Sequence, residues 1–373
     1  METVAPGFRR PRQLQPLSAD AEKTIAAACP GAVVAPWPDL PETHPYWGKA
    51  LSVGTGYAED RDLRFEASSG GVISALLIHA LRSGAVERVL HVAPDPANPA
   101  ANVIAISTTE EQVRAGAGSR YSSSSPLQAI DDVLTSGGPL AFVGKPCDVS
   151  ALRLLGRIDP RVSRSIPLAF SFFCGGIPSD RGVDRILAAR GRQRQELVSF
   201  RYRGHGWPGG VVATMRDGAV ASMSYAESWG DYLSKEIQFR CKICPDAVAG
   251  VADIACGDAW HADEQGYPLF DEGDGRSLVI ARSEIGAGFL ADAVSAGAIS
   301  LKSLEMSEID RMQPAQARRK RLVLSRSAAM ALMLQPTPGM NGNSVGRAAR
   351  KAGKIEQIRN FLGTIRRIAI GRR

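Results

Sequence analysis

The chain of 373 residues has no hydrophobic run long enough to cross a bilayer. Its longest apolar stretch, residues 72–81, is interrupted by Ser74 and His79. The first residues do not resemble a secretory signal, and six cysteines are few for a disulfide scaffold of this size. We therefore exclude an integral membrane protein and a disulfide-rich secreted one. We expect a cytoplasmic protein, membrane-associated only at its surface if at all, whose thiols stay reduced.

Two common signatures of functional sites are also missing. No Gly-x-Gly-x-x-Gly fingerprint follows the first expected strand, at residues 51–57, so a Rossmann-type dinucleotide site is not supported. The five histidines show no spacing typical of metal ligands, and we interpret them as structural.

Acidic residues are almost absent from the C-terminal part of the chain. Residues 311–373 contain fifteen Lys or Arg and one acid, Glu356, and so carry +14. Because the whole chain carries +7, residues 1–310 carry −7. An acidic body gives no case for a nucleic-acid surface, and the basic tail has a single aromatic ring, Phe361, for stacking on bases. We expect no nucleic-acid partner.

The pattern that is present predicts an α/β fold. Short apolar runs closed by glycine turns alternate with helical patterns, which predicts a mixed sheet flanked by helices. Beyond residue 190, three short strands with polar turns predict an antiparallel insertion. We expect four parts: an N-terminal arm (1–45), an α/β part (46–190), a second part with a Cys-x-x-Cys pair (191–310), and a basic linker with an amphipathic tail (311–373).

Four cysteines stand where a metal centre can form. Cys147 and Cys174 each follow an apolar run, at the carboxyl ends of expected strands, where open α/β sheets build their sites. Cys241 and Cys244 form a Cys-x-x-Cys pair. Three segments thus deliver the four thiolates that a cubane iron–sulfur cluster takes. Tetrahedral zinc also takes four thiolates, and single cysteines can simply be buried small hydrophobes.

Two glycine-containing loops have the composition of nucleotide-binding loops. The first precedes the helix expected at residues 72–81, where a serine N-cap and glycines would leave backbone N–H groups bare for a phosphate. The second offers a cation and an aromatic ring, which suit a nucleotide or a flavin. Ordinary helix capping and a solvated loop are the alternatives. The residues concerned are Ser68, Ser69, Gly70 and Gly71, and then Gly118, Ser119, Arg120 and Tyr121.

Two charged residues lie near the same sheet edge. Lys145 follows Gly144 in a tight turn before Cys147. Its ammonium would stabilise an anionic flavin or substrate, or lower the pKa of the thiol; the alternative is a surface lysine. Asp258 follows the strand expected at residues 252–255, and its carboxylate would hold a ribityl or sugar hydroxyl or cap a helix.

These motifs resemble, in order, the coenzyme F420 hydrogenase/dehydrogenase beta-subunit family. The resemblance is carried by Ala67-Ser-Ser-Gly-Gly-Val-Ile-Ser-Ala75, Ala117-Gly-Ser-Arg-Tyr121, Gly144-Lys-Pro-Cys-Asp148, Phe172-Phe-Cys-Gly-Gly-Ile-Pro-Ser179, Phe200-Arg-Tyr-Arg203, Cys241-Lys-Ile-Cys244 and Gly257-Asp-Ala-Trp260. Within the family, the chain is most similar to the branch that includes 7-hydroxymethyl chlorophyll a reductase.

The resemblance implies FAD, bound by the part at 46–190, and a [4Fe-4S] cluster held by the four cysteines. It implies an oxidoreductase that moves electrons between cluster, FAD and a small organic substrate or a deazaflavin. Many relatives carry an N-terminal ferredoxin-like segment, but this chain has only Cys29-Pro-Gly there. Its electrons would then come from an external donor such as a ferredoxin or reduced deazaflavin. The rival hypotheses are a zinc-stapled, non-catalytic scaffold and an electron-transfer subunit without a substrate pocket.

The basic tail predicts a partner of its own. Apolar residues recur every three or four positions through residues 345–370, with Lys and Arg between them. This pattern predicts one basic amphipathic helix, suited to an anionic membrane surface or an acidic partner, or docked on its own acidic body.

Overall fold

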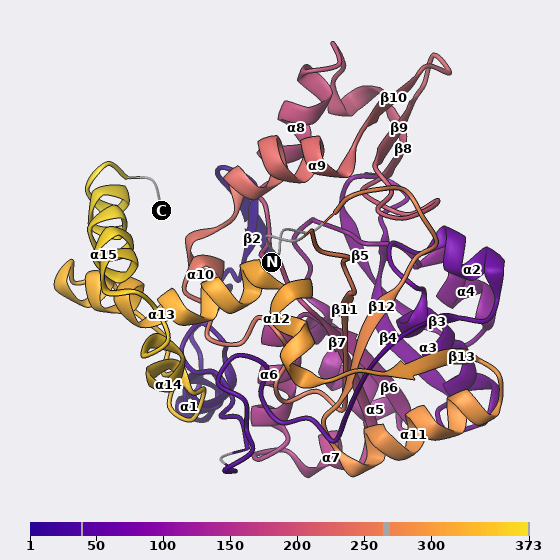
Figure 1. Ribbon diagram of the computed structural model, residues 1–373, viewed down its shortest axis with the longest axis horizontal. Helices are drawn as coiled ribbons and strands as arrows, with labels where there is room; N and C mark the ends of the chain where they lie inside the picture. Colours follow the sequence, from indigo (N-terminus) through magenta and orange to yellow (C-terminus); the bar gives the residue numbers. More distant parts are fainter. Residues whose placement is uncertain (39, 264–268, 372–373) are drawn as a thin grey trace.

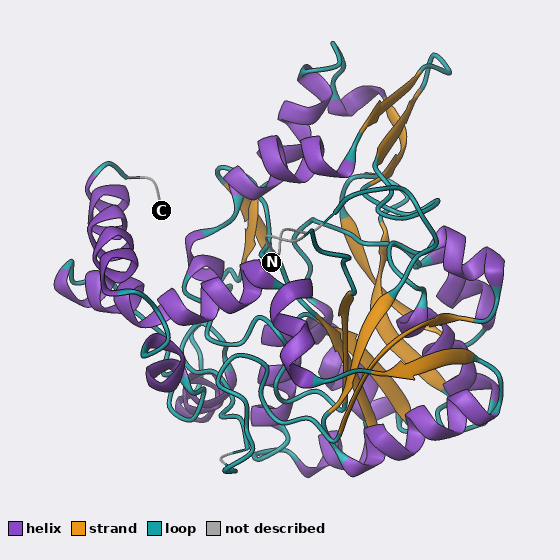
Figure 2. Ribbon diagram, viewed as in Figure 1, coloured by secondary structure: helices purple, strands orange, loops and turns teal. Residues whose placement is uncertain are grey.

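The computed structural model describes residues 1–38, 40–263 and 269–371. Its centre is a mixed sheet of eight strands, in the order β13-β3-β12-β11-β7-β6-β4-β5 (Figure 2). Neighbouring strands β11, β7, β6 and β4 run parallel, and the outer pairings are antiparallel. The strands are β3 (Ser52–Ala58), β4 (Arg88–Pro94), β5 (Asn102–Ser107), β6 (Leu140–Gly144), β7 (Leu168–Phe172), β11 (Ile254–Asp258), β12 (Ser277–Ala281) and β13 (Ile299–Ser303). The predicted α/β fold with a mixed sheet is confirmed.

Helices cover both faces of this sheet because its inner strands are apolar on both sides. In β6, Ala141 packs against one face while Leu140 and Phe142 pack against the other. The first core includes residues of α3 (Val72–Arg82) and α11 (Glu284–Ser295). The second includes residues of α5 (Ile130–Ser136), α6 (Pro146–Leu155) and α7 (Pro160–Ser165). Short helices α2 (Arg61–Glu66) and α4 (Glu110–Ala115) lie beside α3.

The insertion forms a separate antiparallel sheet beyond one end of the main sheet (Figure 1). Strands β8 (Leu197–Arg201), β9 (Val211–Met215) and β10 (Val220–Met223) pack with α8 (Asp180–Ala188) around a third apolar core. The predicted antiparallel insertion is therefore confirmed. From it, α9 (Tyr225–Glu227) and α10 (Phe239–Lys242) lead back to the main sheet at the Cys-x-x-Cys pair.

The termini add structure around this body. The N-terminal residues form a hairpin of β1 (Glu2–Val4) and β2 (Phe8–Arg10), followed by α1 (Ala19–Ala28). At the other end, α12 (Ile309–Met312) leads into α13 (Pro314–Leu332), a helix that the sequence pattern did not predict. Among the described residues, no helix combines the length and apolar character needed to span a bilayer.

The tail is not the single helix that we expected. It consists of α14 (Val345–Ala349) and α15 (Lys354–Ala369), separated by a turn that ends at Gly353. Glycine is a poor helix former, and Gly353 takes an extended conformation as the N-cap of α15. Figure 1 shows α15 beside α13 at the edge of the molecule, away from the central sheet.

Candidate functional site

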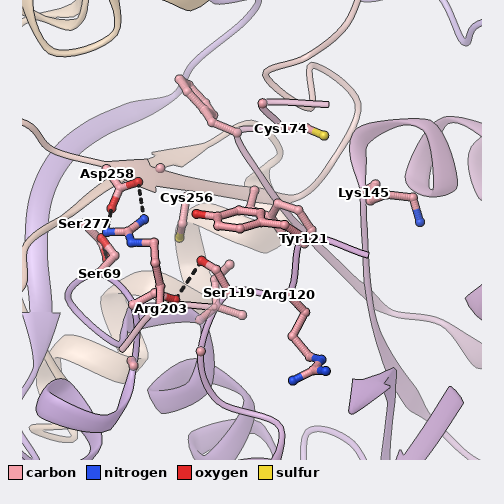
Figure 3. Close-up of a pocket in the computed structure, with 18 of the residues that line it drawn as sticks. Ser69, Ser119, Arg120, Tyr121, Lys145, Cys174, Arg203, Cys256, Asp258 and Ser277 are labelled. Atoms are coloured by element: carbon pink, nitrogen blue, oxygen red, sulfur yellow. Dashed lines mark hydrogen bonds and ion pairs between the residues drawn. The ribbon is translucent and has the colours of Figure 1, made fainter. Parts of the chain in front are cut away.

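A cavity of about 430 Å3 opens at the carboxyl ends of the parallel strands β4, β6, β7 and β11. This is the edge at which open α/β sheets bind ligands, and the volume falls within the range of small-molecule sites. Most of the predicted site residues line it: Ser68, Ser69, Gly71, Gly118, Ser119, Arg120, Tyr121, Gly144, Lys145, Asp258 and Cys174. Figure 3 shows how several of these side chains converge from different segments.

The first predicted loop leads directly into α3. The expected serine N-cap is wrong: the N-cap is Gly71, in the left-handed conformation (φ 73°), with no side-chain hydrogen bond to the first turn. The serines hold the loop instead. Ser68 Oγ accepts from Ser119 Oγ at 2.7 Å, and Ser69 Oγ donates to the Arg276 carbonyl at 2.9 Å. The uncapped N-terminus of an 11-residue helix, lining the cavity, retains its positive end for an anionic group.

Gly70 is needed for the close approach of this loop to the sheet. Its N–H donates to Ser277 Oγ at 3.0 Å, and a Cβ there would lie 2.5 Å from the Gly56 carbonyl oxygen. Gly70 therefore supports the loop from behind, whereas its neighbours Ser69 and Gly71 face the cavity.

The second predicted loop divides its roles between two side chains. Tyr121 contributes its ring to the cavity and packs against Trp229, with centroids 4.9 Å apart. The guanidinium of Arg120 donates to Asn102 Oδ1 and to the carbonyls of Pro99 and Ala101. In Figure 3 it points away from Tyr121. Burial lowers the pKa of Arg120, and its hydrogen bonds show that this cation anchors the loop.

Asp258 has a partner that the sequence did not reveal. Both of its carboxylate oxygens accept from Arg203, at 3.0 Å each, and the Arg203 Nε donates to the Pro208 carbonyl at 2.7 Å (Figure 3). Arg203 is 2% exposed and lies over the rings of Tyr225 and Trp260. Burial alone would lower the pKa of Arg203, but Asp258, together with Tyr121 and Tyr225, outweighs burial and raises it. This ion pair therefore forms part of the cavity wall.

Lys145 is buried, so the surface-lysine alternative is wrong. Its ammonium donates to Asp148 Oδ2 at 2.6 Å and to Ser124 Oγ at 2.8 Å. Burial opposes the charged form, but Asp148 and the neighbouring Cys147 outweigh it, and the pKa of Lys145 is raised. Lys145 also begins α6 as its N-cap, with its backbone N–H bound to Asp148. A fixed cation thus lines the cavity beside the candidate metal ligands.

The four predicted metal ligands gather behind this cavity. The pKa of the Cys147 thiol is raised by burial and Asp148, and also by Cys174 and Cys244; Lys145 opposes this without reversing it. Burial and Cys241 raise the pKa of Cys174. Each of these thiolates therefore lies within electrostatic reach of others from a different segment, and a cationic centre would relieve their repulsion.

The spacing of these thiols bears on the kind of metal centre. Among the described residues, no three His, Cys, Asp or Glu side chains come close enough together to hold one metal ion. A mononuclear zinc needs its four sulfurs at one centre, with bonds of about 2.3 Å. A cubane takes each thiolate on a different iron and so spreads them farther apart. Four thiols are a donor set that either kind of centre takes.

Side chains of helix α13 donate hydrogen bonds to backbone carbonyls of the cysteine-bearing segments. The sequence analysis did not predict this contact. Gln316 and Arg319 both donate to the Cys174 carbonyl, at 3.1 and 2.8 Å. Farther along the helix, Lys320 donates to the Pro245 carbonyl, and Arg326 donates to the Lys242 carbonyl at 2.8 Å. The helix has no apolar stripe. The local sequence therefore does not indicate that these cations contact the cysteine-bearing segments.

A second, smaller cavity of about 270 Å3 opens where α10 meets α13. Cys241 lines it together with four cations, Lys242, Arg318, Arg319 and Arg326. Burial and the nearby cations lower the pKa of Lys242 and bring that of Arg326 to about 10. One candidate ligand thus faces a region of concentrated positive charge.

Comparison with known proteins matches most of this body to one family. Residues 53–131 match the sequence model for the N-terminal part of the "Coenzyme F420 hydrogenase/dehydrogenase, beta subunit", and residues 138–307 match the model for its C-terminal part. The chain is 26% identical to the coenzyme F420 hydrogenase subunit beta of Methanosarcina barkeri over 269 residues, covering 70% of this chain and 84% of that protein. It is also 26% identical to the protein of the same name from Methanothermobacter thermautotrophicus over 300 residues, covering 78% and 99%.

A solved structure shares the fold. A chain of the F420-reducing [NiFe] hydrogenase complex from Methanosarcina barkeri superposes with a TM-score of 0.61 at 19% identity, covering 79% of this chain and 98% of that one. The two sequence models together span about two thirds of the chain, including all four cysteines and both loops of the cavity. The chain therefore belongs to the coenzyme F420 hydrogenase/dehydrogenase beta-subunit family, whose members are oxidoreductase subunits.

Proposed function

We propose that this protein is an iron–sulfur flavoprotein oxidoreductase that moves electrons between a [4Fe-4S] cluster, FAD and an organic substrate or deazaflavin. One observation carries the proposal: the wall of a ligand-sized cavity at the sheet edge includes Cys174, one of four cysteines gathered behind it. A flavin bound there exchanges single electrons with a cluster and electron pairs with an organic molecule.

The residues of the cavity fit FAD in chemical type. The uncapped N-terminus of α3 at Gly71, with Ser69 and Ser119 nearby, would hold a phosphate group. The ring of Tyr121 and the apolar wall would face an aromatic ring system, and the buried cation of Lys145 would stabilise negative charge on it. We propose Lys145 as the catalytic residue of the site. Asp258, held by Arg203, would fix the wall and offer a carboxylate edge to a hydroxyl group.

The substrate class follows from the relatives' names. They are F420 hydrogenase subunits, and coenzyme F420 is a deazaflavin. We propose that the open part of the same cavity admits a planar organic molecule beside the flavin, either a deazaflavin or a conjugated substrate as in the chlorophyll-reductase branch. Both would exchange an electron pair with the flavin.

The second cavity is the proposed route for electrons from outside. The relatives are hydrogenase subunits and act with other subunits. Here Cys241 opens onto Lys242, Arg318, Arg319 and Arg326, so an acidic electron-transfer protein such as a ferredoxin would meet complementary charge beside the cluster. We propose a cytoplasmic protein that receives its electrons at this surface.

Cysteine replacement tests the proposal directly. Cys174→Ser and Cys241→Ser should each lower iron and sulfide per chain and the broad visible absorbance of a cluster, because each removes a thiolate ligand. Cys29→Ser is the matched control, since Cys29 lies in the N-terminal part of the chain and is half-buried. If the two ligand variants keep the iron content and spectrum of the wild type, the four cysteines do not hold a cluster and the proposal fails.

A further inference from the structure

Helix α15 turns its apolar side outward. Ile355, Ile358 and Leu362 are 68%, 58% and 57% exposed. A helix that stabilises a protein by docking normally buries such a row against the core. Here this row of three faces solvent.

Polar groups make much of the contact between α15 and the rest of the chain. Arg326 of α13 donates to Asn360 Oδ1, Gln357 donates to the carbonyls of Ala349 and Ala352, and Glu356 pairs with Arg318. Thr364 is fully buried, and Ile368 is the apolar residue that enters the small core beside α13. The helix is therefore held in a fixed orientation that presents its apolar row outward.

Basic residues border this row on both sides. At about 100° per residue, the side chains of Ile355, Ile358 and Leu362 fall within about 60° of one another around the helix axis. Lys354 lies beside Ile358 on one border, and Arg366 lies beside Ile355 on the other, followed by Arg359. All three cations are exposed. The exposed surface of α15 is thus an apolar stripe with Lys354 on one border and Arg366 and Arg359 on the other.

We propose that this surface, defined by Lys354, Ile355, Ile358, Arg359, Leu362 and Arg366 and named the tail stripe, binds the surface of an anionic membrane. At such a surface the apolar side chains enter the boundary of the acyl chains, while Lys and Arg extend to the headgroups. Each cation near an anionic leaflet adds to the attraction, and residues 311–373 carry +14 in all.

Three further points support this occupant. The matched family region ends at residue 307, so the tail stripe lies outside the part shared with the family. A second copy of the chain would bring an equally basic tail against this one, and the like charges would repel. Because α15 is already folded against α13, binding would require little ordering of the chain. The proposal is independent of the cofactors.

Vesicle co-flotation of the full-length protein tests the proposal. The wild type should float with vesicles of phosphatidylcholine and phosphatidylglycerol (about 7:3) at about 0.1 M salt, and much less with phosphatidylcholine alone. Raising the salt to about 0.5 M should weaken binding, because it screens the cations. The double variant Ile358→Gln/Leu362→Gln should lower the partition coefficient at least about tenfold, since it removes two large apolar side chains without changing charge.

The control is Leu14→Gln/Val220→Gln, which makes the same kind of change at residues that are 86% and 64% exposed elsewhere. It should bind like the wild type, and equal thermal unfolding of both variants would show that they are folded. Failure of the wild type to float with anionic vesicles would overturn the proposal. So would equal loss in both double variants. Self-association of the wild type that disappears in Ile358→Gln/Leu362→Gln, measured by light scattering, would instead assign the stripe to a second copy.

Discussion

The pairing of Arg203 with Asp258 leads to a sharp prediction. Asp258→Asn keeps the size of the side chain but removes its charge, so Arg203 is left without its counter-ion. The Arg203 side chain is 2% exposed, and that of Asp258 is 19% exposed. Among the interactions of the described residues, the Arg203 guanidinium contacts no second carboxylate. Its other hydrogen bond goes to the Pro208 carbonyl. In the variant, burial lowers the pKa of Arg203 without opposition from Asp258. The guanidinium still stays charged, because an arginine side chain is protonated at any ordinary pH.

The expected cost follows from this burial. Removing one partner of a buried ion pair costs about 3–5 kcal/mol, and the partial exposure of Asp258 favours the lower end, about 3 kcal/mol. In a chain of this length that corresponds to a fall of roughly 5 °C in the unfolding temperature. Because both residues line the cavity, binding of FAD should weaken as well.

Chemical denaturation of the purified variant, followed by circular dichroism, measures the change. Asp231→Asn is the matched control: it breaks the exposed pair of Asp231 with Lys235, whose side chains are 65% and 56% exposed, and should cost less than about 1 kcal/mol. A double variant, Arg203→Met/Asp258→Leu, should be more stable than Asp258→Asn because it leaves no unpaired charge. If Asp258→Asn is as mild as the control, the pair does not stabilise the cavity and the reasoning is refuted.

Two further predictions concern the loop and the sheet edge. A Cβ at buried Gly275 would overlap the Ser69 carbonyl, so Gly275→Ala should displace the loop at residues 68–71. The variant should lose about 1–3 kcal/mol of unfolding free energy and bind flavin more weakly in a fluorescence titration. In the control Gly273→Ala the added Cβ meets open space, so neither stability nor flavin binding should change. Burial lowers the pKa of His91 below 6.5, although the hydrogen bond with the Val92 carbonyl acts to raise it. Over a range of pH below 6.5 the unfolded chain therefore binds a proton that the folded chain does not. The free energy of unfolding should therefore fall more steeply in the wild type than in His91→Gln as the pH drops through 6.5, and parallel slopes would contradict this.

The sequence predicted those parts of the fold that have a local signature. Apolar runs ending in glycine located β6 and β7, and with them the positions of Cys147 and Cys174 at the sheet edge. Such runs are informative because a parallel strand buried on both faces must be apolar along its length. The antiparallel insertion was predicted from another local pattern, short strands joined by polar turns.

The parts that were missed depend on tertiary contacts. Helix α13 buries Gln316 and Lys320, whose polar ends reach backbone carbonyls of the cysteine segments, so no apolar stripe indicates the helix. Arg203 and Asp258 lie far apart in the chain, and nothing local shows that they pair. The serine N-cap was wrong because Ser68 and Ser69 bond to distant segments, and Gly71 takes the cap position.

The most direct test of the account is the absorbance spectrum of anaerobically purified protein, with iron, sulfide and flavin measured per chain. A [4Fe-4S] flavoprotein should contain about four irons, about four sulfides and about one FAD per chain, with a broad visible band that dithionite bleaches. A colourless protein that contains about one zinc and no flavin would contradict the account and leave a metal-stapled scaffold in its place.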